Sequence, residues 1–171
     1  MSPTGTDHKL LGIYLNDHFA GSVVGVELAR RAAGSNAGTE LGAFLERLVG
    51  EIESDRDALA SLMEAQGVGR DPLKRGGAWV AEKLGRLKLN GRLTGYSPLS
   101  RLIELEGLML GVTGKLGLWR ALIAADVEAP EGVDLGALVA SAERQRNELE
   151  EWRLRAAREA VGEAAASATR A

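Results

Sequence analysis

The chain has 171 residues, of which 45% are hydrophobic and 26% charged, a composition typical of one globular domain. Its net charge of −3 and its pI near 5.5 give no overall attraction to nucleic acid or to an anionic membrane. It contains no cysteine, which excludes disulfides, thiolate metal sites, iron–sulfur clusters and cysteine nucleophiles. The fold must therefore be stabilised by packing, and an electrostatic partner must be attracted by a local charged surface.

The N-terminal region lacks the features of a secretory signal. Residues 1–9 are polar, and the stretch that follows is amphipathic rather than purely apolar. The most apolar long stretch, residues 102–125, is interrupted by two glutamates, a lysine and an arginine, too many charges for a lipid-facing span. We therefore expect a cytoplasmic protein without a transmembrane segment.

Polar caps and glycines delimit the first two predicted helices. The first is expected over residues 7–33, because Gly34 readily adopts the left-handed backbone of a helix end. The second begins at Asn36 or Thr39 and ends at Gly67. Its apolar residues recur every three or four positions and predict one buried stripe: Leu41, Leu45, Leu48, Ile52, Leu59 and Leu62.

Two cap-and-proline pairs predict the next helices. Asp71-Pro72 and Ser97-Pro98 each place an N-cap before a proline, which has no amide hydrogen to leave unsatisfied in the first turn. The third helix is short and ends near Asn90-Gly91. The fourth runs to about Ala124 and is apolar on several sides, so we expect most of its surface to be buried.

Asp134 caps the fifth predicted helix. Gln145 occupies a position in its apolar stripe, between Ala142 and Leu149, while the opposite side is rich in Glu and Arg. The alanine-rich residues 161–171 are expected to fray.

The lengths of the connections predict how these helices pair. The first and second are joined by about five residues and the fourth and fifth by about nine, both short enough for antiparallel neighbours. About thirty residues separate the second and fourth. We predict one all-α domain, an up-down four-helix bundle over residues 7–160 with one long crossover that contains the short third helix. This layout resembles the ferritin-like superfamily.

That resemblance implies a di-iron site, with a Glu from each of two helices and a Glu-x-x-His motif from each of the other two. The chain has neither Glu-x-x-His motif. Its two histidines, His8 and His18, lie about 15 Å apart along one helix, too far to bind one metal together. The resemblance is therefore to a divergent member of the superfamily.

Several polar residues interrupt the predicted apolar stripes. Asp55 interrupts that of the second helix and His18 that of the first, at similar heights in an antiparallel pair. With Glu51, Glu106 and Glu148 they would form a carboxylate-rich site with a single imidazole, suited to Fe or Mn. The favoured alternative is a buried hydrogen-bonded cluster in which His18 and Asp55 compensate each other. A third interpretation leaves one or more of these groups in solvent.

A basic segment, residues 70–101, contains eight basic and two acidic residues, which leaves a net charge of −9 for the rest of the chain. On a helix, Arg75, Trp79, Lys83 and Arg86 would share one side. They would bind phosphate groups or an anionic surface, with Trp79 stacking on a base. Alternatively, they would complement acidic patches of this chain or of a second copy.

No catalytic motif is convincing. Ser22 is one helical turn from His18, but Asp17 points about 100° away from that histidine. We expect a non-enzymatic structural or protein-interaction module without a cofactor, forming a homo-oligomer, with a dimer favoured. The alternatives are a metal-binding bundle with metal-handling or oxidase-like activity, and anionic-ligand binding through the third helix.

Overall fold

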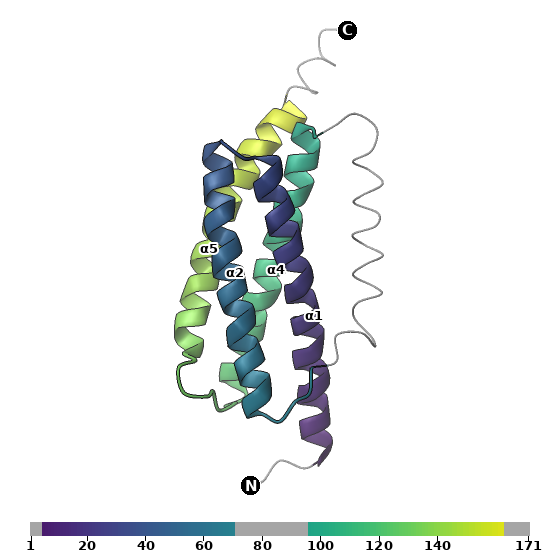
Figure 1. Cartoon of the computed structure of the whole chain (residues 1–171), viewed down its shortest axis with the longest axis vertical. Coiled ribbons are helices and arrows are strands. Elements are labelled where there is room, and N and C mark those ends of the chain that lie inside the picture. The colour runs from purple at the N-terminus through teal and green to yellow at the C-terminus, as the bar shows by residue number, and fades with distance from the viewer. Residues whose placement is uncertain (1–4, 71–95, 163–171) are drawn as a thin grey trace.

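The computed structural model describes residues 5–70 and 96–162 (Figure 1). These residues form four long α-helices, and the fourth continues into a short π-helix, η1. The elements are α1 (Gly5–Ser35), α2 (Glu40–Ala65), α4 (Pro98–Ala124), α5 (Leu135–Ala157) and η1 (Arg158–Gly162). The expected third helix lies outside the described residues.

The starts of α2, α4 and α5 follow the predicted caps. The side chains of Thr39, Ser97 and Asp134 each accept a hydrogen bond from a backbone amide of the first turn of α2, α4 and α5 respectively. Pro98 occupies the first turn of α4. Gly67, just after α2, has a φ of +65°, a left-handed conformation that favours glycine. By contrast, α1 continues through Gly34, which was expected to end it, as far as Ser35, and the left-handed glycine that follows it is Gly38, with a φ of +76°.

The helices pack in two antiparallel pairs, α1 with α2 and α4 with α5 (Figure 1). In Figure 1, α1 and α5 run upward while α2 and α4 run downward. The pairs meet mainly where α1 packs against α4, whereas α2 and α5 make few contacts. The prediction of an all-α bundle of pairwise-packed helices is confirmed for the described residues.

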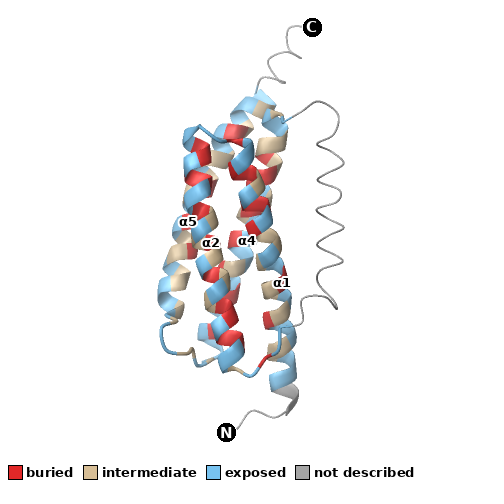
Figure 2. Cartoon of the chain, in the orientation of Figure 1, coloured by how far each residue is buried: buried red, intermediate tan, exposed pale blue. Residues whose placement is uncertain are grey.

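The hydrophobic core consists of two clusters along the bundle axis. One includes Leu45 and Leu105, and the other Leu62 and Trp119. Between them the buried stripe is interrupted on three helices by polar residues, Asp55 on α2, Lys115 on α4 and Gln145 on α5. Figure 2 shows buried residues along the inward faces of the helices and exposed residues outside.

The outer surface of α4 is more exposed than the sequence suggests. Leu99 and Ile123 are exposed, and Leu110 is 75% exposed. The reason is that α4 packs mainly on α1 and α5 among the described elements, which leaves one side uncovered by them. By length and composition alone α4 is also apolar enough to cross a membrane, a property that core helices of bundles share. The cytoplasmic location stays a prediction.

Candidate functional site

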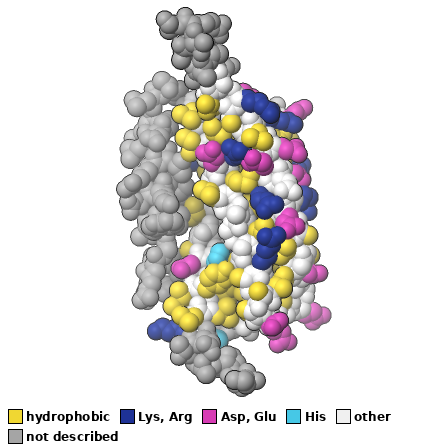
Figure 3. All heavy atoms as spheres, turned by 180° about the vertical axis from the view of Figure 1, so that it is seen from behind, with side chains coloured by type: hydrophobic (Ala, Val, Ile, Leu, Met, Phe, Trp, Pro, Cys, Tyr) yellow, Lys and Arg dark blue, Asp and Glu magenta, His cyan; other side chains and the backbone are white. Residues whose placement is uncertain are grey.

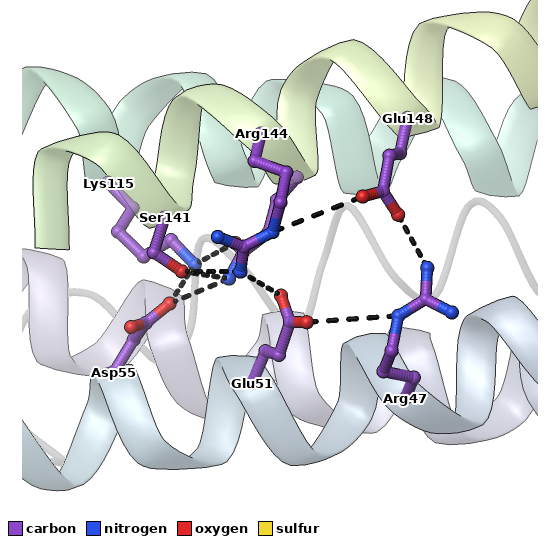
Figure 4. Close-up of polar contacts among 8 residues, drawn as sticks. Arg47, Glu51, Asp55, Lys115, Ser141, Arg144 and Glu148 are labelled. Atoms are coloured by element: carbon purple, nitrogen blue, oxygen red, sulfur yellow. Dashed lines mark hydrogen bonds and ion pairs between the residues drawn. The ribbon is translucent and has the colours of Figure 1, made fainter. Parts of the chain in front are cut away.

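Three side chains from three helices form what we call the polar layer: Asp55, Lys115 and Gln145 (Figure 4). Lys115 Nζ donates to the Asp55 carboxylate and, at 2.6 Å, to Gln145 Oε1. Gln145 Nε2 donates to Asp55 Oδ2 and to Ser141 Oγ, both at 3.2 Å. The polar layer therefore ties α2, α4 and α5 together at one height of the bundle.

Burial determines the electrostatics of the polar layer. Asp55 and Gln145 are buried, and Lys115 is nearly so. Desolvation lowers the pKa of the Lys115 ammonium, and the negative charge of Asp55 opposes that shift. A buried carboxylate without a partner would be costly, so the ion pair with Lys115 compensates Asp55.

The residues that compensate Asp55 differ from those expected. Asp55 is buried, as the interrupted stripe predicts, and Gln145 is buried in the stripe of α5. Lys115 and Gln145, rather than His18, are the hydrogen-bond partners of Asp55 among the described residues. The sequence did not predict Lys115 as a partner of Asp55, because a lysine within an apolar helix does not indicate which residue of another helix it will pair with.

Two of the predicted metal ligands, Glu51 and Glu148, lie together on the surface but with arginines between them (Figure 4). Arg144 Nη2 lies 3.2 Å from Glu51 Oε2, and Arg47 Nη2 lies 2.5 Å from Glu148 Oε2. Contacts of 3.8 Å between Arg47 and Glu51 and of 3.9 Å between Arg144 and Glu148 close the ring. We call these four residues the charged square. They link α2 to α5, and their two positive and two negative charges cancel.

Glu106, the fourth predicted carboxylate ligand, is exposed and lies 3.7 Å from Arg153 on α5. The five predicted ligands therefore do not meet at one point. Glu51 and Glu148 share the charged square, His18 and Asp55 line one pocket, and Glu106 lies apart from both groups. Among the described residues, no group of three or more His, Cys, Asp or Glu side chains is placed to hold a metal ion. The predicted anion-binding residues, Arg75, Trp79, Lys83 and Arg86, lie outside the described residues.

Beside the polar layer, a pocket of about 310 Å³, which we call the central cavity, lies between α1, α2 and α4 and opens to solvent on the side where Leu110 and Gly111 are exposed. Its wall is mainly apolar and includes Ile52, Leu59 and Leu118. Glycines on two helices contribute to the space, because a Cβ built at four of them would meet no atom within 4 Å. These four are Gly21 and Gly25 on α1, and Gly111 and Gly114 on α4.

His18 lines the central cavity. Burial lowers the pKa of its imidazole, and the negative charge of Asp17 opposes the shift, so His18 is neutral near pH 7. Its ring lies edge-on to that of Tyr14, with 4.7 Å between centroids. Ser22, also in the wall, donates its hydroxyl to the carbonyl of Phe19 at 2.7 Å, so it is not hydrogen-bonded to His18 as a nucleophile would be.

Trp119 closes another part of the cavity wall. Its side chain is only 1% exposed, yet its indole N–H has no acceptor among the residues that the structure describes. Most buried donors in proteins are paired, so an unpaired one calls for a physical reason.

No family model, curated protein or solved structure matches this chain. The ferritin-like resemblance therefore remains one of layout. The properties of the central cavity and the polar layer must be judged from their own geometry.

A second buried carboxylate, Glu104, escaped the sequence prediction. Arg31 Nε donates to Glu104 Oε1 at 3.0 Å, and the Tyr96 hydroxyl donates to Glu104 Oε2 at 3.1 Å. Asn36 Nδ2 donates to Tyr96 at 2.7 Å, and its Oδ1 accepts from Arg101 Nε at 3.1 Å. Burial raises the pKa of the Tyr96 hydroxyl. This cluster joins the C-terminal end of α1 to the start of α4.

Proposed function

We propose that this protein is a non-enzymatic, ferritin-like helical bundle that binds a small, mainly apolar molecule in the central cavity. The observation that carries the proposal is a cavity of about 310 Å³ whose wall is mainly apolar and borders the polar layer. Concave apolar sites with a few polar groups are typical of small-molecule binding. The layout of two antiparallel pairs, with a long connection between α2 and α4, supports the ferritin-like comparison.

The arrangement of polar groups favours binding over catalysis. Lys115 and Asp55 already satisfy each other, and the Ser22 hydroxyl is engaged by the backbone. A nucleophile needs a general base within hydrogen-bond reach, and Ser22 bonds to the backbone instead. The polar groups therefore orient a ligand rather than react with it.

The size of the cavity limits the size of the ligand. An apolar cavity of about 150 Å³ inside a helical protein holds one benzene molecule. A volume of about 310 Å³ therefore suits a molecule of about two rings. Naphthalene is a suitable first probe.

Calorimetry with naphthalene and the full chain tests this proposal. We expect saturable binding that is lost in Gly25→Leu and weakened in Gly111→Leu, because both side chains would extend from the cavity wall. Gly50→Leu is the matched control, since Gly50 is a helical glycine with open space that does not line the cavity. Absence of binding to the wild-type chain, or binding that persists in Gly25→Leu, would contradict the proposal.

A second candidate function is self-association through an exposed stripe at the start of α1. Leu10, Ile13 and Tyr14 lie on one face of the helix and are all exposed, Leu10 by 61%. An apolar helical face of this kind commonly packs on a partner helix, and a second copy would offer the same face for a symmetric dimer. Analytical ultracentrifugation should show a dimer that Ile13→Glu dissociates, whereas Leu154→Glu on α5 leaves it intact. A monomer at all concentrations would rule this out.

A further inference from the structure

His18 and Ser22 are polar side chains of α1 in the wall of the central cavity. The structure gives the two ring nitrogens of His18 no hydrogen-bond partner among the described residues, and neither nitrogen is fully buried. The edge-on contact with Tyr14 supports the ring without using its nitrogens. Because His18 lines the cavity, a molecule bound there can supply the partner that the imidazole lacks.

The hydrogen-bonding capacity of these two side chains specifies what that partner must do. A neutral imidazole has one nitrogen that donates and one that accepts. The Ser22 hydroxyl gives its hydrogen to the Phe19 carbonyl, which leaves its oxygen able to accept a hydrogen bond. Since His18 and Ser22 are four residues apart on one helix, their side chains are neighbours. One group of a ligand placed between them would accept from the imidazole and donate to the serine, as a hydroxyl can.

The charges of the cavity wall favour an uncharged ligand. Its two cations are already engaged, Lys115 by Asp55 and Arg56 by Asp57, so an anion would lose its hydration without gaining a free counter-charge. Asp55 is compensated by the same ion pair, and Asp17 is exposed, so water screens its charge. A cation would therefore gain as little as an anion.

The remaining wall favours a molecule that is apolar apart from this one group. Ile52, Leu59 and Leu118 contribute hydrocarbon. At the open side Leu110 is 75% exposed, and Figure 3 shows further hydrophobic side chains reaching the surface on the face seen from behind. A ligand hydroxyl that leaves water for such a pocket needs protein partners, and His18 and Ser22 provide them.

From these observations we infer that the central cavity binds an uncharged apolar molecule with one hydroxyl group, which accepts a hydrogen bond from the His18 imidazole and donates one to Ser22 Oγ. The inference rests on the proposed ligand-binding function and specifies its chemistry. It distinguishes alcohols and phenols from hydrocarbons with the same ring system.

Two probes that share one ring system test this inference. 2-Naphthol adds one hydroxyl to naphthalene, and at about pH 7.5 it is uncharged, because phenols ionise near pH 10. Calorimetry on the full wild-type chain, His18→Phe and Ser22→Ala measures the ratio of the two affinities. His18→Phe retains an aromatic ring and removes both nitrogens. We expect the preference for 2-naphthol to be about fivefold greater in the wild type than in either variant, the value of one neutral hydrogen bond.

The chain offers a matched control for each variant. His8 is an exposed histidine of α1 that lies outside the cavity wall and bonds to the Gln66 carbonyl. Ser61 of α2 donates its hydroxyl to the Asp57 carbonyl, much as Ser22 does within α1, and is also outside the wall. His8→Phe and Ser61→Ala should therefore retain the wild-type ratio.

A spectroscopic measurement on the wild-type chain removes dependence on the folding of the variants. The ¹⁵N resonances of the His18 ring respond to hydrogen bonding, so 2-naphthol should shift them more than naphthalene does. The His8 resonances should stay in place. Because the chain has two histidines, His8→Phe assigns the remaining signals to His18.

The outcomes separate the inference from the proposed function. Equal affinity ratios in the wild type and either cavity variant, an equal fall of the ratio in the control variants, or equal ¹⁵N shifts with both probes would overturn the inference while leaving cavity binding intact. Failure of both probes to bind the wild-type chain would overturn the proposed function as well. A greater ratio in the wild type together with the larger shift supports both.

Discussion

Lys115 of α4 is hydrogen-bonded to the carboxylate of Asp55 on α2 at the level where the two hydrophobic clusters of the core separate. Gln145 of α5 bonds to both residues, so one buried ion pair engages three helices. The same level of the bundle holds the central cavity, and both Asp55 and Lys115 line it. The interruption of the core and the candidate binding site are therefore parts of one feature.

The first prediction concerns this ion pair. Lys115→Met should lower the free energy of unfolding by about 3–5 kcal/mol, because it leaves Asp55 buried without its counter-charge. Combining it with Asp55→Leu should restore most of the stability, since a buried ion pair is often replaceable by apolar residues of similar volume. Urea unfolding followed by circular dichroism measures both. If Lys115→Met were as stable as the double variant, Lys115 would not compensate the charge of Asp55.

The helices were predictable because their signals are local. A cap such as Ser97 or Asp134 acts on amides within its own first turn, so the sequence contains both partners of the interaction. The inward position of Asp55 also followed from the periodicity of a single helix. The whole set of described helices could be assigned on this basis.

The partners inside the bundle were not predictable, because they depend on helix rotation. Glu106 was placed inside by its apolar neighbours, yet Glu104 is the buried carboxylate, and two residues correspond to about 200° around a helix. The pairing of Asp55 with Lys115 joins residues 60 positions apart, and no local pattern encodes it. The central cavity is lined by glycines of both α1 and α4, which only the assembled structure brings to one pocket.

The second prediction concerns pH. Because burial lowers the pKa of His18, the unfolded chain takes up a proton near pH 6.5 before the folded chain does. Stability from this residue is complete above pH 6.5 and is lost as pH falls toward the lower folded pKa. The loss is at most about 1.4 kcal/mol per pH unit for one proton.

His18→Gln should therefore show a weaker decline in stability than the wild type between pH 7.5 and pH 5. Asp17→Asn provides an informative comparison, because it removes the charge that opposes the shift and should steepen the decline. Chemical unfolding at a series of pH values gives all three curves. Parallel curves for the wild type and His18→Gln would contradict the prediction.

The third prediction uses the glycines. Gly25→Ala should raise the free energy of unfolding by about 1 kcal/mol, since alanine is the better helix former and its Cβ meets open space. Gly107→Ala should gain less, because its Cβ would lie 2.9 Å from Leu28 Cδ2. Gly42→Ala should be strongly destabilising, because its Cβ would lie 2.2 Å from the backbone oxygen of Asn36. Thermal unfolding of the three variants should reproduce this order.

The last prediction compares two sets of ion pairs with different exposure. Arg144 of the charged square is about half exposed, so Arg144→Ala should cost no more than about 1 kcal/mol and its effect should shrink at high salt. Glu104 is buried and accepts hydrogen bonds from Arg31 and Tyr96, so Glu104→Ala should cost about 2–4 kcal/mol with little salt dependence. The free energies of unfolding of both variants and the wild type, measured at 0.05 M and 1 M salt, test this difference. If Arg144→Ala lowered the free energy of unfolding by the same amount at both salt concentrations, the charged square would contribute through packing of its side chains rather than through charge.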